Sequence, residues 1–380
     1  MRALTAPPVI TGWGVVSPLG IGAAAFTEAV LSGAGCAGCA VDISAMFDEP
    51  LPRDVACVLP GFDVREHLGR KGTSAYDRVT ALTVVACGLA LRDAGLHAPG
   101  PATEETGLAL GTNLGSARST WEFGRETYLR SRPHLVSPQL FPNAAINCAA
   151  GQAAIRYGLR GVNATLAAGP PAALTALRYA RNALRGGHAT AMIAGAAEEY
   201  SPQNAWLARH WHGGREARLL GEAAALFALE PAAEGATGRG RAELLAVELA
   251  GGEPAPEAVS ATVEGCARRA LALARVAPEE VDLAVTCGGP AECPRTRAEE
   301  EVLDRLLAQA RCRRFRVADT AGDCLAASAG VQLATVLARF GSPERSPDRS
   351  VALVTSLGWD GAAGAAVLRR CPDDRSDHRL

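Results

Sequence analysis

Short apolar strand-like segments alternate with helices of ten to twenty residues along the whole chain, and this alternation restricts the fold to a few architectures. The strand-like segments of the first half lie near residues 9–20, 105–111, 163–168, 189–196 and 219–230. Helical periodicity lies between them, near residues 23–31, 74–94, 143–157 and 172–185. Such alternation predicts mostly parallel or mixed sheets with helices packed on their faces.

A stretch rich in proline, alanine and glycine at residues 231–239 interrupts this pattern, which then starts again. Further strands are predicted near residues 243–249, 281–286, 314–318, 350–356 and 364–368, with helices at 256–275, 297–310 and 323–339. The sequence therefore predicts two α/β halves, residues 1–235 and 236–380. The Arg/Asp-rich end, residues 372–380, is expected to be a frayed tail.

Charge and composition exclude several classes of function. The formal net charge of −2 gives no electrostatic reason to bind nucleic acid or an anionic membrane. Lys71 is the only lysine, so no other position can form a Schiff base or provide a P-loop lysine. No apolar run is long enough to span a bilayer. We expect no cofactor and no metal.

The 11 cysteines are widely spaced and no signal peptide precedes them, which predicts a cytoplasmic protein with reduced thiols. Cys36 and Cys39 have the spacing of a redox or zinc motif, but no second pair accompanies them. His210 and His212 are also two apart without a third ligand, and we interpret them as part of a polar surface turn.

Six segments in order along the chain carry a family resemblance. They are Val9–Gly20, Gly161–Pro170, Ala194–Glu198, Val281–Gly288, Thr320–Asp323 and Ser356–Gly361. Each is unspecific alone, but the ordered set resembles a β-ketoacyl synthase of the thiolase fold over nearly the whole chain. The resemblance implies two pseudo-repeated α/β halves, with mixed sheets packed in a layered αβαβα arrangement.

The family's catalytic residues are missing at the matching positions. The resemblance implies a nucleophilic cysteine at a helix N-terminus and two histidines that support decarboxylation of a malonyl unit. Pro170 occupies the cysteine position, and Cys287 and Asp323 occupy the histidine positions. Proline has neither a thiol nor a backbone N–H for an oxyanion hole, and an ionised aspartate would oppose a developing carbanion. We therefore expect the chain to be catalytically inactive on its own.

One branch of the family shares such losses, namely the chain-length factor of type II polyketide synthases. The segment Trp121–Tyr128 resembles the part of that subunit that lines the polyketide tunnel, and it maps the gate positions onto Trp121, Gly124 and Tyr128. On a helix, their spacings of three and seven residues place all three side chains on one face. Trp359, in the glycine-rich loop near the carboxyl end, is a further candidate for the tunnel or gate.

The resemblance also implies the partners of the chain. It predicts a heterodimer with an active ketosynthase subunit, and contact through that complex with an acyl carrier protein and its acyl chain. Dimers of this fold pair one strand from each subunit, and the small residues of the strand near 163–168 make it the candidate. The predicted interface residues are Asn163, Ala164, Ala167 and Ala168.

Two alternatives to a chain-length factor remain open. The chain would be an acyltransferase or ketosynthase if an unconventional nucleophile, such as Cys287, accepted an acyl group, although a small buried core thiol is the plainer interpretation of Cys287. It would be a binding or scaffold protein if it reused the fold without a ketosynthase partner. Asp323 has an interpretation of its own, as the N-cap of a helix that opens at Cys324.

Overall fold

A computed structural model describes residues 6–33, 35–96, 100–138, 140–211, 219–232, 240–289, 293–342 and 349–372. The division predicted between residues 235 and 236, like His212 and the tail beyond residue 372, lies outside these ranges.

Apart from two short strands, the described strands form one mixed, 11-stranded sheet, and its two halves repeat the same strand order. In the first half the order is β1 (Val9–Ser17), β8 (Ala223–Glu230), β7 (Ala191–Glu198), β5 (Thr106–Thr112) and β6 (Asn163–Ala167). In the second half it is β9 (Ala242–Ala250), β13 (Ala363–Arg370), β12 (Val351–Leu357), β10 (Val281–Thr286) and β11 (Arg313–Arg316). Parallel and antiparallel pairings also correspond between the halves.

The two halves meet at a short seam. β1 pairs with β9 only at two positions, where Val9 lies opposite Glu243 and Ile10 lies opposite Ala242. Beyond them the two groups of strands diverge. The predicted α/β fold with two repeated halves is therefore confirmed, although this seam makes the sheets continuous. The short β2 (Gly20–Ile21) pairs with β1, and β3 (Val41–Asp42) pairs with β4 (Val55–Ala56) in a small separate sheet.

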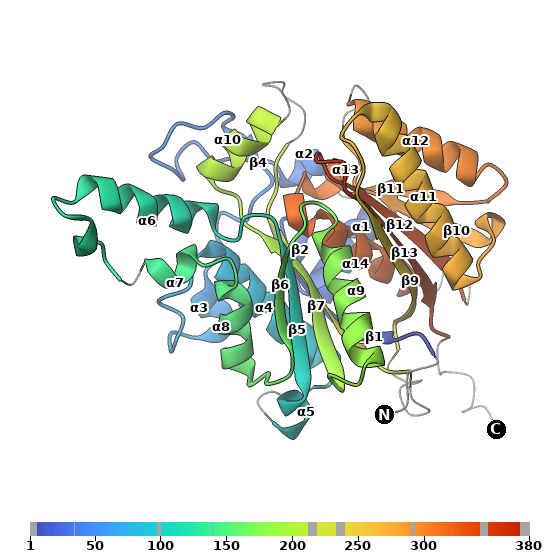
Figure 1. Ribbon diagram of the computed structural model, residues 1–380, viewed down its shortest axis with the longest axis horizontal. Helices are drawn as coiled ribbons and strands as arrows, with labels where there is room; N and C mark the ends of the chain where they lie inside the picture. The colour runs from blue at the N-terminus through green and yellow to red at the C-terminus, as the bar shows by residue number, and fades with distance from the viewer. Residues whose placement is uncertain are drawn as a thin grey trace.

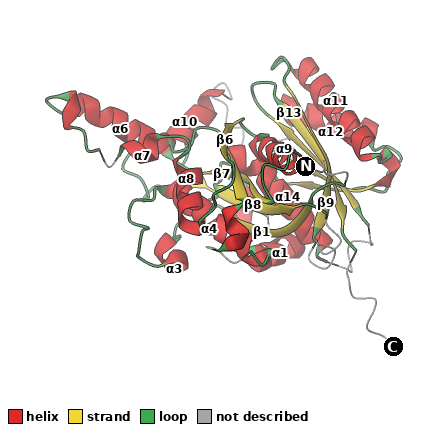
Figure 2. Ribbon diagram, turned by 60° about the horizontal axis from the view of Figure 1, so that its bottom comes forward, coloured by secondary structure: helices red, strands yellow, loops and turns green. Residues whose placement is uncertain are grey.

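Helices form three layers around these strands (Figures 1 and 2). The middle layer is α9 (Ala172–Arg185) and α14 (Ser328–Phe340), which contact each other and strands of both halves. Outside the first half lie α4 (Arg78–Asp93) and α8 (Cys148–Tyr157), and outside the second half lie α11 (Pro256–Ala274) and α12 (Pro294–Leu306). α1 (Ala23–Ser32) packs on α14.

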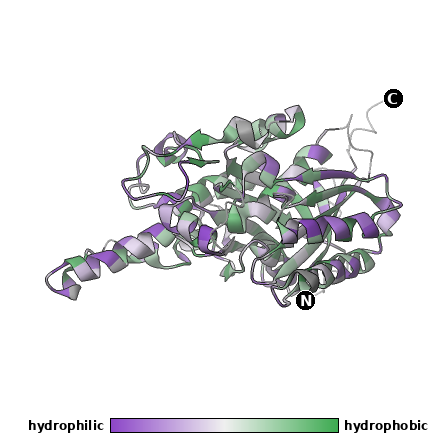
Figure 3. Ribbon diagram, turned by 90° about the horizontal axis from the view of Figure 1, so that it is seen from above, coloured by the Kyte–Doolittle hydropathy of each residue, from purple (hydrophilic) through white to green (hydrophobic). Residues whose placement is uncertain are grey.

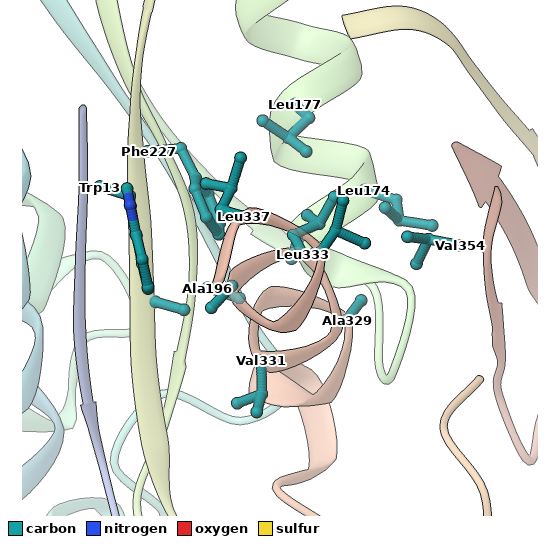
Figure 4. Packing of buried hydrophobic residues seen from close by; sticks show 14 of the residues in the cluster. Trp13, Leu174, Leu177, Ala196, Phe227, Ala329, Val331, Leu333, Leu337 and Val354 are labelled. Atoms are coloured by element: carbon teal, nitrogen blue, oxygen red, sulfur yellow. The ribbon is translucent and has the colours of Figure 1, made fainter. Parts of the chain in front are cut away.

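The middle layer is the centre of the hydrophobic core. Every residue of α14 is buried, and Leu333 and Leu337 pack between Leu174 of α9 and Phe227 of β8 (Figure 4). Small residues permit these close approaches. A Cβ atom on Gly195 of β7 would lie only 2.0 Å from the carbonyl oxygen of Ala225, so this position accepts no side chain. The alanine-rich composition of the chain thus serves tight layer packing.

One helical arm leaves this body. α6 (Ala117–Leu129) extends away from the sheets, and the chain returns through a 3₁₀ turn at Pro133–Leu135 and the short α7 (Phe141–Ala144) (Figures 1 and 3). Ser119, in the first turn, is the only buried residue of α6. The helix predicted for the gate segment is therefore present, but it projects from the body.

Two sequence-based expectations differ from the structure outside the arm. The predicted polar turn at His210 and Trp211 is instead the last turn of α10 (Pro202–Trp211), whose Ala205 and Ala208 are buried. The predicted helix at 143–157 is two helices, α7 and α8, separated by Ala145–Asn147. The short α2 (Cys36–Cys39), α3 (Val64–Leu68), α5 (Pro101–Glu104) and α13 (Ala318–Ala321) complete the helices within the described ranges.

Candidate functional site

Pro170, Cys287 and Asp323 line one pocket, together with Trp359. The pocket encloses about 390 Å³, counting the space open to solvent. Cys293, Arg295, Thr296, Glu299 and Leu357 complete its lining. Topology produces this convergence: Pro170 follows β6 and Cys287 follows β10, while Asp323 precedes α14. The pocket thus lies where the chain leaves the carboxyl ends of β6 and β10, one strand from each half, near the N-termini of the middle helices.

Pro170 leaves the helix N-terminus without a nucleophile. It is buried, it follows Gly169 at a φ of 56°, and Pro171 is the N-cap of α9. The N-terminal end of a helix stabilises a thiolate or an oxyanion through its free N–H groups. Two successive prolines remove two such groups and supply no sulfur.

Cys287 and Asp323 are engaged in structural roles. Cys287 is 3% exposed, and its carbonyl oxygen accepts the N–H of Ala318 at 2.7 Å. One carboxylate oxygen of Asp323 accepts the N–H of Leu325 at 3.0 Å and the hydroxyl of Ser328 at 3.3 Å. The structure differs from the predicted N-cap: the element is a 3₁₀ turn at Leu325–Ala327 whose N-cap is Cys324, and Asp323 binds the first N–H of that turn from one residue earlier.

Trp359 belongs to this pocket and not to the arm. Its ring stacks on that of Trp211 from α10, with centroids 4.4 Å apart and planes inclined by 21°. The Arg295 guanidinium donates a hydrogen bond to the carbonyl oxygen of Trp359, which fixes the loop that carries the ring. Arg295 and Trp359 thus form one side of the pocket, with the indole of Trp211 stacked on that of Trp359.

The other gate candidates expose apolar surface on the arm. Trp121 is 40% exposed and Tyr128 is 89% exposed, and no atom lies within 4 Å of a Cβ placed on Gly124. Phe141 of α7 is 61% exposed, although its ring contacts Phe123 of α6 with centroids 5.7 Å apart. Solitary surface rings are common, but a projecting arm with several of them is typical of a surface that another chain covers.

β6 presents the second such surface. It is the last strand on its side of the sheet and pairs only with β5 among the described strands. Asn163 and Ala167 are exposed, Ala164 and Ala168 are half-buried, and Ile155 on the adjacent α8 is 77% exposed. An uncovered edge with small side chains permits close approach of another strand.

The sequence reasoning missed a buried pair of carboxyl groups at the base of the arm. Glu198 is the last residue of β7, and Glu199 follows it directly. Burial raises the pKa of each to about 8. Each accepts hydrogen bonds from the segment that leads into α6. Two adjacent acids at the end of an apolar strand were the only sequence signal for this pair.

The remaining motifs hold no site within the described residues. No group of three potential metal ligands is present there, and His210 is exposed at the end of α10. Cys39 donates to the carbonyl oxygen of Thr320 at 2.7 Å and lies 3.6 Å from the sulfur of Cys57, not in a zinc cluster. None of the helices searched has both the length and the apolar character that a bilayer crossing requires.

The sequence of the chain matches known β-ketoacyl synthases. The Beta-ketoacyl synthase N-terminal domain model matches residues 6–217. The 3-oxoacyl-[acyl-carrier-protein] synthase 2 of Coxiella burnetii is 30% identical over 304 residues, which cover 72% of this chain and 71% of that protein. The protein of the same name from Vibrio cholerae is 28% identical, over 58% of this chain and 57% of its own length.

Solved structures extend the match to the full fold. A chain of the ishigamide ketosynthase/chain length factor has 39% identity and a TM-score of 0.82, covering 96% of this chain and 100% of its own. A Beta-ketoacyl synthase from Burkholderia phymatum, with 21% identity, has the same fold at a TM-score of 0.83 and covers 97% of this chain and 100% of its own. The chain therefore belongs to the β-ketoacyl synthase family.

Proposed function

We propose that the chain is a non-catalytic chain-length factor of a type II polyketide synthase. It forms a heterodimer with an active ketosynthase subunit in the cytoplasm, and its arm shapes the tunnel that receives the growing acyl chain. The acyl carrier protein delivers its chain to the complex. One observation carries the proposal: the residues where this family places its nucleophile and histidines converge on one pocket as Pro170, Cys287 and Asp323.

Surface properties favour a subunit over an independent binding protein. The arm and the β6 edge both leave apolar or unpaired groups uncovered in the single chain. An obligate interface of about 2,000 Å² or more would cover surfaces of this kind. The likeness to the ishigamide ketosynthase/chain length factor, at 39% identity over nearly the full length, supports the same assignment.

The deciding experiment is co-expression with the ketosynthase encoded beside this chain. We expect the two subunits to co-elute in equal amounts, and we expect omission of this chain to abolish product or alter its length. The ketosynthase expressed alone, and this chain expressed alone, are the controls. Separate elution together with an unchanged product distribution would refute the proposal.

The alternative of an acyltransferase that uses Cys287 makes a different prediction. A thiol with 3% exposure, in a pocket whose described lining residues include no imidazole base, gives a poor nucleophile. We expect no acyl adduct when the purified chain is incubated with an acyl carrier protein thioester and its intact mass is measured. An adduct that disappears in Cys287→Ala would establish the alternative.

A further inference from the structure

The arm helix α6 depends on its first turn for its position. Beyond Ser119 none of its side chains is buried, and its helix contacts are to α7, to α10 and to the 3₁₀ turn at Pro133–Leu135 within the arm itself. A helix held mainly at one end changes direction when the groups at that end rearrange. The contacts of Ser116 and Ser119 therefore determine where Trp121, Gly124 and Tyr128 lie.

Two carboxyl groups connect the start of α6 to the start of α4. Asp77 is the N-cap of α4, where one oxygen accepts the N–H of Thr80 at 3.0 Å and the other accepts the Ser119 hydroxyl at 3.1 Å. Glu199 repeats the arrangement. One oxygen accepts the N–H of Val79 at 3.1 Å, and the other accepts the hydroxyl of Ser116, the N-cap of α6, at 2.9 Å.

These bonds form a bracket between two helix N-termini, which we define as Asp77, Glu199, Ser116 and Ser119. Ser116 also accepts the N–H of Ser119 at 3.1 Å, so the first turn of α6 is closed within the bracket. Glu199 is 1% exposed and Ser116 is 3% exposed. Because water has no access to these two groups, it cannot replace a lost hydrogen bond between them. Loss of the Glu199 carboxyl would therefore weaken the attachment of the first turn of α6.

We infer that Glu199 is the positioning residue of the arm, and that its protonation state determines how firmly α6 is held against the body. This inference rests on the proposed function only where it concerns product length. A protonated Glu199 keeps both contacts: one oxygen still accepts the Val79 N–H, and the carboxyl O–H donates to Ser116 Oγ, whose own hydroxyl then donates to Ser119 Oγ at 2.9 Å. An ionised Glu199 retains acceptors but holds charge in a site that excludes water.

The charges around Glu199 oppose its ionisation. Asp77 at the start of α4 and Glu198 on its own strand both disfavour a second negative charge, and burial is the largest cause of its raised pKa of about 8. Arg118, on α6, is the cation that interacts with it, but Arg118 pairs with Glu122 at 2.8 Å. Arg78 is also committed, in an ion pair with Glu222 at 2.5 Å.

The sign of the pH effect follows from this raised pKa. Glu199 has an ordinary value of 4.5 in the unfolded chain and about 8 in the folded protein. Between these values the folded state binds the additional proton, so stability falls as pH rises. The contribution of Glu199 is fully present below about pH 4.5 and is lost as pH rises through about 8. We therefore expect α6 to loosen at alkaline pH.

Hydrogen exchange of the full chain tests this inference without any partner. The amides of residues 117–129 are followed by mass spectrometry at several pH values from about 6.5 to 9, with correction for intrinsic exchange, and α14 serves as the internal reference for global folding. In the wild type, we expect protection of α6 to fall as pH passes about 8 while α14 stays protected.

Matched variants identify the responsible group. Glu199→Gln imitates the protonated acid, so α6 should stay protected across the whole pH range. Glu199→Ala should exchange about tenfold faster in α6 at every pH, because Ser116 and the Val79 N–H lose a buried partner. Glu198→Gln, which makes no contact with Ser116, should keep the pH step and move it to lower pH. An unchanged pH step in Glu199→Gln, or wild-type protection in Glu199→Ala, would overturn the inference.

Product length extends the test to the complex. With the co-expressed ketosynthase, the wild type should change its distribution of product lengths between pH 7 and 9, whereas Glu199→Gln should not. Loosening of α6 without any change in product length would overturn the role of Glu199 in length control. Failure of the wild-type subunits to associate would instead refute the proposed function. The hydrogen-exchange result would still test whether Glu199 positions α6, because that experiment uses the chain alone.

Discussion

Gly124→Trp in this chain, co-expressed with its ketosynthase, should shorten the polyketide by at least one extension unit. Gly124 lies on the helix face that carries Trp121 and Tyr128, and a Cβ at this position meets no atom within 4 Å. The first atom of the new side chain therefore meets no clash within the chain itself. If this face lines the tunnel, an indole occupies volume that the acyl chain would otherwise fill, and a packed tunnel accepts no further carbons.

The measurement is the distribution of product lengths by mass spectrometry, normalised to the amount of purified heterodimer. Gly61→Trp is the matched control, because Gly61 also has open space around its Cβ and belongs to the exposed loop before α3, not to α6. Products of unchanged length from an intact Gly124→Trp heterodimer would remove α6 from the tunnel wall.

Ala167→Arg should separate the subunits. Ala167 is exposed on β6, at the uncovered edge of the sheet, and the isolated chain can keep an arginine there in water. In a heterodimer that pairs this edge with a strand of the ketosynthase, the guanidinium would be buried without a counter-charge. Such a charge costs about 3 kcal/mol or more, which is over about 100-fold in the dissociation constant.

Size-exclusion chromatography and a titration of the two subunits would measure this effect. Ala272→Arg on α11 adds the same charge to an exposed position in the second half of the chain and should leave association unchanged. Retention of wild-type affinity by Ala167→Arg would place the interface elsewhere and would also refute Asn163, Ala164 and Ala168 as its centre. Thermal unfolding of both variants alone would verify that each is folded.

Local regularity explains which elements the sequence predicted well. The helix at Ala172–Arg185 and the strand at Val281–Thr286 have the bounds that the periodicity indicated. Both bury one continuous apolar pattern and end at clear turn residues. α10 was missed because Pro202–Trp211 mixes polar and aromatic residues, and its buried face, including Asn204 and Ala205, is identified only by what packs on it.

The site shows the same division. The losses predicted at Pro170, Cys287 and Asp323 come from motif order alone, since they are matters of residue identity. The stack of Trp211 on Trp359 and the contacts of Glu199 could not be predicted, because Glu199 lies 83 residues from Ser116 and 120 residues from Val79, and the two tryptophans are also far apart in the sequence. No local pattern encodes a contact that arises when distant segments are brought together by the sheet.

By itself, the sequence determined the two-half α/β fold, and it predicts that the nucleophile is missing, because the first follows from local periodicity and the second from which atoms each side chain carries. Only the tertiary structure decided where the altered positions meet, that the gate helix stands away from the body, and that buried acids hold its base. These properties depend on burial and on distances between remote segments, which set the desolvation and hydrogen bonding of each group.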